Sequence, residues 1–467
     1  MTNPKNYLLE EISKVDYKIN FNKKIKYYNH NTIENIPKIK KFLSDEIIFD
    51  MKVVASVLPF KVNNYVIEEL INWEDALNDP IFKLTFPQRA MLLDSDYEKM
   101  ASLIKNNSEK QKILLEANKI RNSLNPHPAG QLNHNIPTFH GRKLEGMQHK
   151  YAQTVLFFPA QGQTCHSYCT FCFRWPQFVN IDDLKFASND IDSVLLYIKN
   201  HPEVTDLLFT GGDPMVMSPN LIAKYFDKII NAKIPHLRNI RIGTKSLAYF
   251  PYLYLANSGS DVIFDAFKRA INAGLHISIM AHFNHFKELE TDAVQLALER
   301  ILHSGARIRT QSPVFNHINN SAEIWEKMLN MQVNLGLTPY YMFIARDTGA
   351  QHYFKVSLHD AWQIFRTAYG KLSGLARTVR GPSMSCGPGK IQVLGVSEIN
   401  EQKVFVLRFL QGRSGDWVHR PFFAKYDENA YWITDLKPAF NEDKFFFEDE
   451  LKEIYAKMEI VDDIEMD

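Results

Sequence analysis

The stretch TDLLFTGGDPMVMSPNLIAKYFDKII, residues 205–230, contains an apolar strand candidate, a Gly-Gly-Asp-Pro turn and an amphipathic helix candidate. Pairs of this kind, a strand followed by a helix, recur about six times between residues 150 and 395, which predicts a parallel sheet. No Gly-X-Gly-X-X-Gly fingerprint opens the first pair. We therefore expect an α/β fold with a partial parallel barrel of (βα)6 type rather than a doubly wound sheet, and we expect its last strand at KIQVLGV, residues 390–396.

The sequence changes character on both sides of this barrel candidate. Residues 1–145 carry apolar positions at three- and four-residue spacing, as in VIEELINWEDAL, and predict a helical N-terminal segment. Residues 146–395 form the expected barrel core. Residues 396–467 change to stretches such as VFVLRFLQGR and end in an acidic helical tail, which predicts a small α+β C-terminal extension.

Composition narrows the classes of partner. Lys plus Arg (54) nearly balances Asp plus Glu (53) in 467 residues, so no overall field favours nucleic acid or an anionic membrane. No stretch approaches the roughly 18 uncharged apolar residues of a membrane span, and the N-terminus lacks the apolar core of a secretory signal. We expect a cytoplasmic protein. Four cysteines, three of them clustered, indicate a metal or redox site sooner than a disulfide framework.

Three cysteines follow the strand candidate TVLFFPA in the order Cys165-His-Ser-Tyr-Cys169-Thr-Phe-Cys172. This spacing allows one loop to place three thiolates on one face of an iron–sulfur cubane, which needs such soft ligands. A fourth iron without a cysteine leaves an open position for a small molecule. The alternatives are a structural zinc knuckle that uses His166 or a distant residue, and three inert buried thiols. Zinc sites, however, usually pair two close ligands with two more at a distance.

The CxxxCxxC loop, with Phe171 before its last cysteine, resembles the radical S-adenosylmethionine superfamily. The resemblance implies a [4Fe–4S] cluster on the three cysteines, whose free iron binds S-adenosyl-L-methionine and whose electron breaks the sulfonium to give a 5′-deoxyadenosyl radical. It also places the adenine near Phe171. One strand–helix pair later, Gly211-Gly212-Asp213-Pro214 is similar to the superfamily motif that holds the amino group of S-adenosylmethionine.

Further stretches narrow the resemblance to the lysine 2,3-aminomutase family, over roughly residues 55 to 395. They follow the order of the family: RIGTKS, AHFNHFKEL, TQSPVFNHINN, PYYMF and CGPGK, which ends at Lys390. Family members carry pyridoxal 5′-phosphate on a lysine in such a turn, so the resemblance implies that Lys390 is the catalytic, cofactor-binding lysine. Lys150 and Tyr151 fall where the family holds the cofactor phosphate, but Thr154 replaces a second arginine there.

The expected substrate contacts match the family less completely. Arg174 occupies the position that pairs with the substrate carboxylate, a task suited to a guanidinium. Of the two family aspartates that bind the distal ammonium of lysine, Asp347 matches one, and Ser383 stands where the second is expected. Losing one carboxylate weakens the binding of a buried ammonium by on the order of a few kcal/mol. The implied substrate is therefore lysine or a related amino acid, with arginine, another amino acid or a modified residue left open.

The resemblance implies an isomerase, a pyridoxal-phosphate-dependent 2,3-aminomutase that moves an amino group from Cα to Cβ by radical chemistry. It implies a small-molecule amino acid substrate and a reductant such as flavodoxin or ferredoxin. Any homo-oligomer should lack the family's intersubunit zinc, because the cysteines of that site are missing. One alternative is a radical enzyme of the same scaffold that acts on a protein-bound lysine, or that abstracts hydrogen without amino migration. The more distant alternative is a non-enzymatic zinc or iron–sulfur binding protein.

Overall fold

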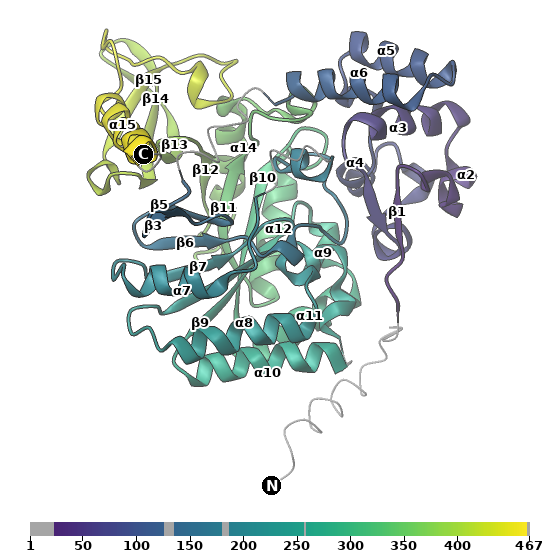
Figure 1. The fold of residues 1–467 in the computed structure, drawn as a ribbon. Coiled ribbons are helices and arrows are strands. Elements are labelled where there is room, and N and C mark those ends of the chain that lie inside the picture. Colours follow the sequence, from purple (N-terminus) through teal and green to yellow (C-terminus); the bar gives the residue numbers. More distant parts are fainter. Residues whose placement is uncertain (1–22, 126–134, 180–185, 256–257, 465–467) are drawn as a thin grey trace.

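One eleven-stranded sheet forms the centre of the computed structural model, which describes residues 23–125, 135–179, 186–255 and 258–464 (Figure 1). The strands from β6 to β12 lie side by side in sequence order and pair in parallel, whereas β5 and β13 to β15 add antiparallel edges. The strands of this sheet are β5 (Met147–Tyr151), β6 (Thr154–Phe157), β7 (Asp206–Phe209), β8 (Asn239–Thr244), β9 (His276–His282), β10 (Arg307–Val314), β11 (Thr338–Ile344), β12 (Arg380–Ser385), β13 (Gly389–Ile399), β14 (Gln402–Gly412) and β15 (Pro421–Lys425).

Helices connect the successive parallel strands and cover one side of the sheet (Figure 1). In α8 the buried residues Ile222, Tyr225, Phe226 and Ile229 follow the helical period, so a single apolar face packs towards the sheet. This arrangement confirms the expected partial (βα)6-type barrel. The connecting helices are α7 (Ile191–Lys199), α8 (Pro219–Ala232), α9 (Ser246–Tyr249), α10 (Ser258–Asn272), α11 (Asp292–His303), α12 (Ala322–Asn334), α13 (Gln351–Phe354) and α14 (Leu358–Gly370).

The last parallel strand is not the one expected from the sequence. KIQVLGV lies in β13, which pairs antiparallel with β12, and the stretch RGPSMS forms the parallel strand β12 instead. The Gly381-Pro382 pair inside β12 is typical of turns, so the sequence conceals this strand. As a consequence, Lys390 lies just after a tight turn at the carboxyl end of β12, where the carboxyl ends of the parallel strands meet.

The flanking regions lie on opposite sides of the barrel core in Figure 1. The described part of the expected N-terminal segment contains helices and two short strand pairs, and its residues 1–22 and 126–134 lie outside the described residues. The C-terminal extension consists of the end of the sheet and one long helix. The expected boundary at 395/396 falls inside β13, so the sheet continues across it, and the division into three domains remains a prediction. These elements are α2 (Pro37–Phe42), α3 (Asp45–Val57), α4 (Pro80–Thr85), α5 (Asp94–Lys105), α6 (Lys110–Ser123), β1 (Tyr27–Asn29), β2 (Lys61–Asn63), β3 (Thr138–Phe139), β4 (Arg142–Lys143) and α15 (Glu448–Ile464).

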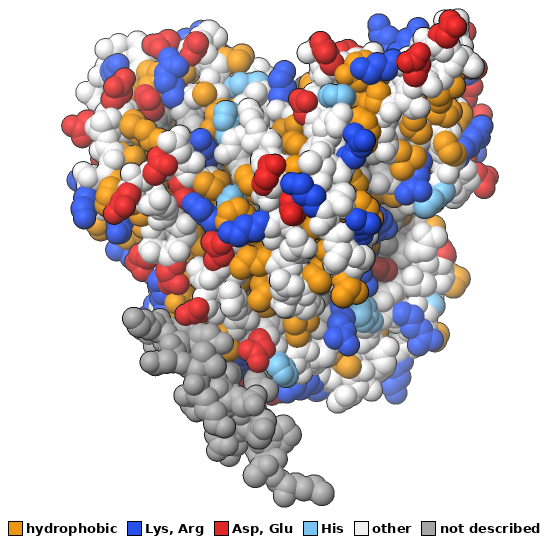
Figure 2. Space-filling view, turned by 180° about the vertical axis from the view of Figure 1, so that it is seen from behind, with side chains coloured by type: hydrophobic (Ala, Val, Ile, Leu, Met, Phe, Trp, Pro, Cys, Tyr) orange, Lys and Arg blue, Asp and Glu red, His pale blue; other side chains and the backbone are white. Residues whose placement is uncertain are grey.

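The surface carries mixed charge. On the face shown in Figure 2, basic and acidic side chains are interspersed with apolar ones. This distribution agrees with the net formal charge of +1. None of the helices in the described ranges combines the length and the apolar character needed to cross a bilayer.

Candidate active site

The N-terminal segment holds the cysteine loop, which follows β6. The backbone carbonyl of Lys61 accepts a hydrogen bond of 2.7 Å from the amide of Tyr168. The fully buried side chain of Asn63 donates to the carbonyl of His166 at 3.0 Å and to the carbonyl of Tyr249 at 2.8 Å. Buried amide groups are costly to leave unpaired, so these bonds fix the loop firmly between the N-terminal segment and the barrel.

The three thiols of this loop suit a cubane. Cys165, Cys169 and Cys172 are half-buried and close enough for electrostatic coupling. Burial raises the pKa of Cys169 to about 12 and that of Cys172 to about 11. Within the described residues, no three His, Cys, Asp or Glu side chains converge as ligands of a single ion. A [4Fe–4S] cluster takes each cysteine on a different iron, so this donor set fits such a cluster.

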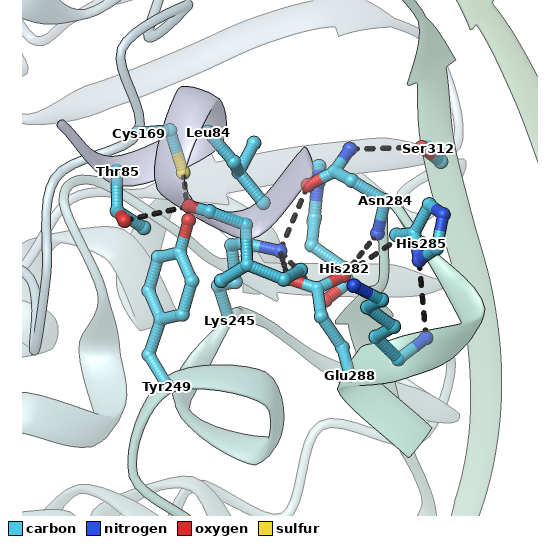
Figure 3. Close-up of polar contacts among 12 residues, drawn as sticks. Leu84, Thr85, Cys169, Lys245, Tyr249, His282, Asn284, His285, Glu288 and Ser312 are labelled. Carbon is cyan, nitrogen blue, oxygen red and sulfur yellow. Dashed lines mark hydrogen bonds and ion pairs between the residues drawn. The ribbon is translucent and has the colours of Figure 1, made fainter. Parts of the chain in front are cut away.

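A buried polar network flanks Cys169 (Figure 3). The hydroxyl of Tyr249 lies 3.2 Å from Sγ of Cys169, and Nζ of Lys245 lies 4.6 Å from the centroid of the Tyr249 ring. Lys245 forms an ion pair of 2.6 Å with the fully buried Glu288 and donates to Oδ1 of Asn284 at 2.8 Å. The Tyr249 hydroxyl is therefore placed to donate a hydrogen bond to a cysteine thiolate, and the Lys245–Glu288 pair packs against the ring of Tyr249 through Lys245.

The Gly-Gly-Asp-Pro turn at the end of β7 packs directly against the cysteine loop. Gly211 has a φ of 138°, a value that favours glycine. A Cβ atom on Gly212 would lie 2.6 Å from the carbonyl oxygen of Thr164, the residue that precedes Cys165. The close approach that these two glycines permit is therefore to the chain itself, and it sets the position of the cysteine loop relative to β7.

Two of the residues expected to contact S-adenosylmethionine already have partners within the protein. The buried carboxylate of Asp213 accepts hydrogen bonds from Oγ1 of Thr244 at 2.6 Å and from the amide of Lys245 at 3.0 Å, and burial raises its pKa to about 6. The ring of Phe171 lies 3.9 Å from that of Phe315 between centroids. Phe171 lies within the cysteine loop and Asp213 lies beside it, and their contacts with S-adenosylmethionine remain predictions.

Lys390 lies half-buried at the start of β13, just after the carboxyl end of β12, among several cationic side chains. Its Nζ donates to Oε1 of Gln411 at 2.9 Å and lies 4.2 Å from the centroid of the Tyr341 ring. Burial, together with the positive charges of Arg241 and Arg380, holds the pKa of Lys390 well below its usual value. A lowered pKa favours the neutral, nucleophilic form of the amine, which a carbonyl-binding lysine requires.

The residues around Lys390 fit an anionic group such as a phosphate. Lys150 donates to the carbonyl of Cys386 in the turn before Lys390, and burial lowers the pKa of Lys150 to about 7. The buried hydroxyl of Tyr151 and the buried Nη2 of Arg380 have no hydrogen-bond partner in the described part of the chain. Buried donors without partners are costly, and the oxygens of a phosphate would satisfy them.

The expected substrate residues lie near this pocket but differ from the family pattern. The guanidinium of Arg174 lies 4.5 Å from the centroid of the Phe158 ring, and burial lowers its pKa to about 10. Asp347 follows the end of β11, directly after Arg346. Ser383 is fully buried in β12, and its hydroxyl donates to the carbonyl of Met342 at 3.3 Å. The position expected to carry a second carboxylate is therefore neutral and already bonded.

The chain is similar in sequence to L-lysine 2,3-aminomutases. The chain matches no family model. Over 416 residues it is 29% identical to a putative L-lysine 2,3-aminomutase of Aquifex aeolicus, in a match that spans 88% of this chain and 95% of that relative. Over 246 residues it is 27% identical to the L-lysine 2,3-aminomutase of Bacillus subtilis, spanning 53% of this chain and 49% of that relative. These relatives support a radical S-adenosylmethionine, lysine 2,3-aminomutase-like family for this chain.

Members of this family differ in the amino acid for which they are named. The chain is 25% identical over 230 residues to a glutamate 2,3-aminomutase of Clostridioides difficile, with 49% of this chain and 51% of that relative covered. It thus spans about half the length of that relative and of the Bacillus subtilis enzyme. A crystal structure of Streptococcus suis SuiB bound to S-adenosylmethionine aligns over 67% of this chain and 66% of SuiB, with 13% identity and a TM-score of 0.32. That likeness is too low to bear on fold or function.

The structure of this aminomutase-like chain shows residues that the sequence did not reveal. Tyr249, Lys245 and Glu288 lie in the motifs RIGTKS and AHFNHFKEL or next to them, but no spacing rule indicated that they meet beside Cys169. Arg380 lies in the concealed strand β12. Ionisable residues next to apolar strand segments were the sequence feature that could have indicated them, because such side chains usually have a partner or a ligand.

Proposed function

We propose that this protein is a pyridoxal 5′-phosphate-dependent amino acid 2,3-aminomutase that uses a [4Fe–4S] cluster and S-adenosyl-L-methionine. The observation that carries the proposal is the placement of Lys390 among several cationic side chains, at the same sheet edge as the cysteine loop. A lysine whose pKa is lowered, next to buried donors that have no partner in the described chain, suits a phosphorylated aldehyde cofactor. The relatives named for lysine and for glutamate support an amino acid as the substrate.

The proposed reaction is an isomerisation. The bond between the amino nitrogen and Cα breaks, a bond from that nitrogen to Cβ forms, and one hydrogen moves from Cβ to Cα, so no net oxidant or reductant is consumed. When bound at Cys165, Cys169 and Cys172, the cluster with S-adenosylmethionine would supply radical chemistry for hydrogen abstraction, and pyridoxal phosphate held at Lys390 would supply radical stabilisation. The protein contributes placement and the exclusion of water.

The residues of the pocket have separate roles in this proposal. Lys390 binds the cofactor aldehyde in the absence of substrate. Lys150, Tyr151 and Arg380 hold the phosphate, because they present donors without an acidic partner near Lys390. Arg174 orients the substrate carboxylate between the cluster loop and the cofactor, since it follows Cys172 by two residues and is coupled electrostatically to its thiol.

An anaerobic assay tests the proposal. The protein is reconstituted with iron and sulfide, reduced with dithionite, supplied with S-adenosylmethionine and incubated with each of the twenty amino acids, with and without pyridoxal phosphate. We expect about four irons per chain and a β-amino isomer of one substrate that forms only with both cofactors. Mass spectrometry after chromatography identifies the isomer.

Two variants give the assay its control. Lys390→Ala should abolish isomer formation and reduce binding of pyridoxal phosphate, whereas Lys437→Ala, at an exposed position of the C-terminal extension, should leave both unchanged. Formation of 5′-deoxyadenosine without any isomer would contradict an aminomutase of free amino acids and favour the alternative, hydrogen abstraction from a protein-bound lysine or another substrate. Stoichiometric zinc with no iron would contradict both.

A further inference from the structure

Two arginines that form no ion pair within the described ranges lie near one aromatic ring beside Cys172. The guanidinium of Arg174 lies 5.2 Å from the centroid of the Phe173 ring, and that of Arg346 lies 4.4 Å from the same centroid. Both side chains are half-buried. Over the described ranges, no carboxylate oxygen lies within ion-pair distance of either guanidinium. Two like charges that are partly withdrawn from water are costly unless an anion joins them.

Arg346 lies between the two halves of the proposed reaction centre. Its charge acts on Lys390, where it helps to lower the pKa of the lysine, and on Arg174, whose pKa it also lowers. Arg174 in turn is coupled to the thiols of Cys165 and Cys172. The pair therefore spans the space between the cofactor lysine and the cluster loop, where a substrate must lie for its Cβ to meet the radical.

Negative charge is limited near Arg346 in the described part of the chain. Asp347 is the carboxylate that acts on Arg346, and it adjoins that guanidinium in the chain. Ser383, where the resemblance leads one to expect a second carboxylate, is neutral, fully buried and bonded to Met342. An ammonium group on the substrate side chain would meet one carboxylate and the repulsion of Arg346. A carboxylate there would meet the guanidinium of Arg346, which forms no ion pair within the described ranges.

We propose that the substrate is a dicarboxylic α-amino acid of the glutamate or aspartate type, whose α-carboxylate pairs with Arg174 and whose side-chain carboxylate pairs with Arg346. This inference rests on the proposed function, because it assigns the substrate of the same site. In the proposed function Lys150, Tyr151 and Arg380 would bind the cofactor phosphate, and we assign Arg174 and Arg346, whose charge also acts on Lys150 and Tyr151, to the substrate. Each guanidinium can hold a carboxylate by two parallel hydrogen bonds.

Calorimetric titration of the holoenzyme tests the inference without turnover. The protein carries its oxidised cluster, S-adenosylmethionine and pyridoxal phosphate, and no reductant is present. The probes are L-glutamate, L-aspartate, their neutral isosteres L-glutamine and L-asparagine, and L-lysine. We expect at least one dicarboxylate to bind about 10- to 100-fold more tightly than its amide, the ratio that one charged hydrogen-bonded pair provides. L-Lysine should bind more weakly than that dicarboxylate.

Matched variants assign the effect to Arg346. Arg346→Gln should raise the Kd of the preferred dicarboxylate by about 10- to 100-fold, leave that of its amide nearly unchanged and leave pyridoxal phosphate binding intact. Arg366→Gln, at an exposed position of α14, should change none of these values. A variant that lost pyridoxal phosphate instead would assign Arg346 to the phosphate and overturn the inference.

The failure of the inference is distinguishable from the failure of the proposed function. If L-lysine binds most tightly and the reduced enzyme converts it to a β-amino isomer, the aminomutase function stands and the dicarboxylate assignment is wrong. If the dicarboxylate binds through Arg346 but no amino acid gives an isomer, the binding assignment stands and the aminomutase function is wrong. Equal Kd values for L-glutamate and L-glutamine, and for L-aspartate and L-asparagine, overturn the inference directly.

Discussion

Replacement of Glu288 by glutamine should destabilise the protein strongly, because Glu288 neutralises a lysine beside the cluster loop. Its side chain is fully buried, and one carboxylate oxygen lies 2.6 Å from Nζ of Lys245, whose side chain is only 11% exposed. The other oxygen accepts hydrogen bonds from the amides of Asn284 and His285, the latter at 3.1 Å. An amide side chain has one oxygen and cannot serve both the ammonium and these two donors.

Breaking a buried ion pair by removing one partner costs about 3–5 kcal/mol, and the retained amide oxygen places Glu288→Gln near the lower end of that range. The measurement is urea unfolding of the cofactor-free protein, followed by tryptophan fluorescence. Glu290→Gln is the matched control, because Glu290 forms an exposed pair of 2.9 Å with Lys327 and should lose less than about 1 kcal/mol. If the two variants lose the same free energy of unfolding, the pair at Lys245 does not stabilise this region and the reasoning is wrong.

Three further changes probe the rest of the site. Gly212→Ala would place a Cβ 2.6 Å from the Thr164 backbone, so it should lower the free energy of unfolding in urea by about 1–3 kcal/mol and reduce iron incorporation. In the control Gly374→Ala the new Cβ meets no atom within 4 Å, and neither quantity should change. The pKa of Lys150 is about 7 in the folded protein and about 10.4 in the unfolded chain, so its contribution to the free energy of unfolding rises with pH between these values. Lys150→Met should therefore flatten that part of the plot of unfolding free energy against pH. An unchanged slope would contradict the burial of Lys150. Tyr249→Phe should lower the midpoint potential of the cluster by about 20–60 mV, because it removes one hydrogen bond to sulfur of about 0.5–1.5 kcal/mol. If the potential does not shift and only the stability changes, Tyr249 has a structural role alone.

Local patterns were sufficient to predict the barrel and its cluster loop. Strand-then-helix alternation depends on side-chain periodicity within each segment, and Cys165, Cys169 and Cys172 lie in one short loop, so neither required knowledge of distant contacts. The same locality explains the one error in the sheet. Gly381-Pro382 indicates a turn by local rules, but pairing with β11 on one side and β13 on the other holds this stretch as a strand.

The amino-acid sequence alone predicts the fold class and the thiol donor set, because each depends on neighbouring residues, and the family resemblance indicates the lysine of the Gly-Pro-Gly-Lys turn. The surroundings of these groups depend on tertiary contacts. The tertiary structure brings Lys150, Arg346 and Arg380 from three separate strands or strand ends to Lys390. Such charges are far apart in the chain, and their energies depend on burial and distance, which no local spacing encodes. Burial and neighbouring positive charges lower the pKa of Lys390, and Arg346 forms no ion pair within the described ranges; the proposed cofactor and substrate rest on these tertiary features.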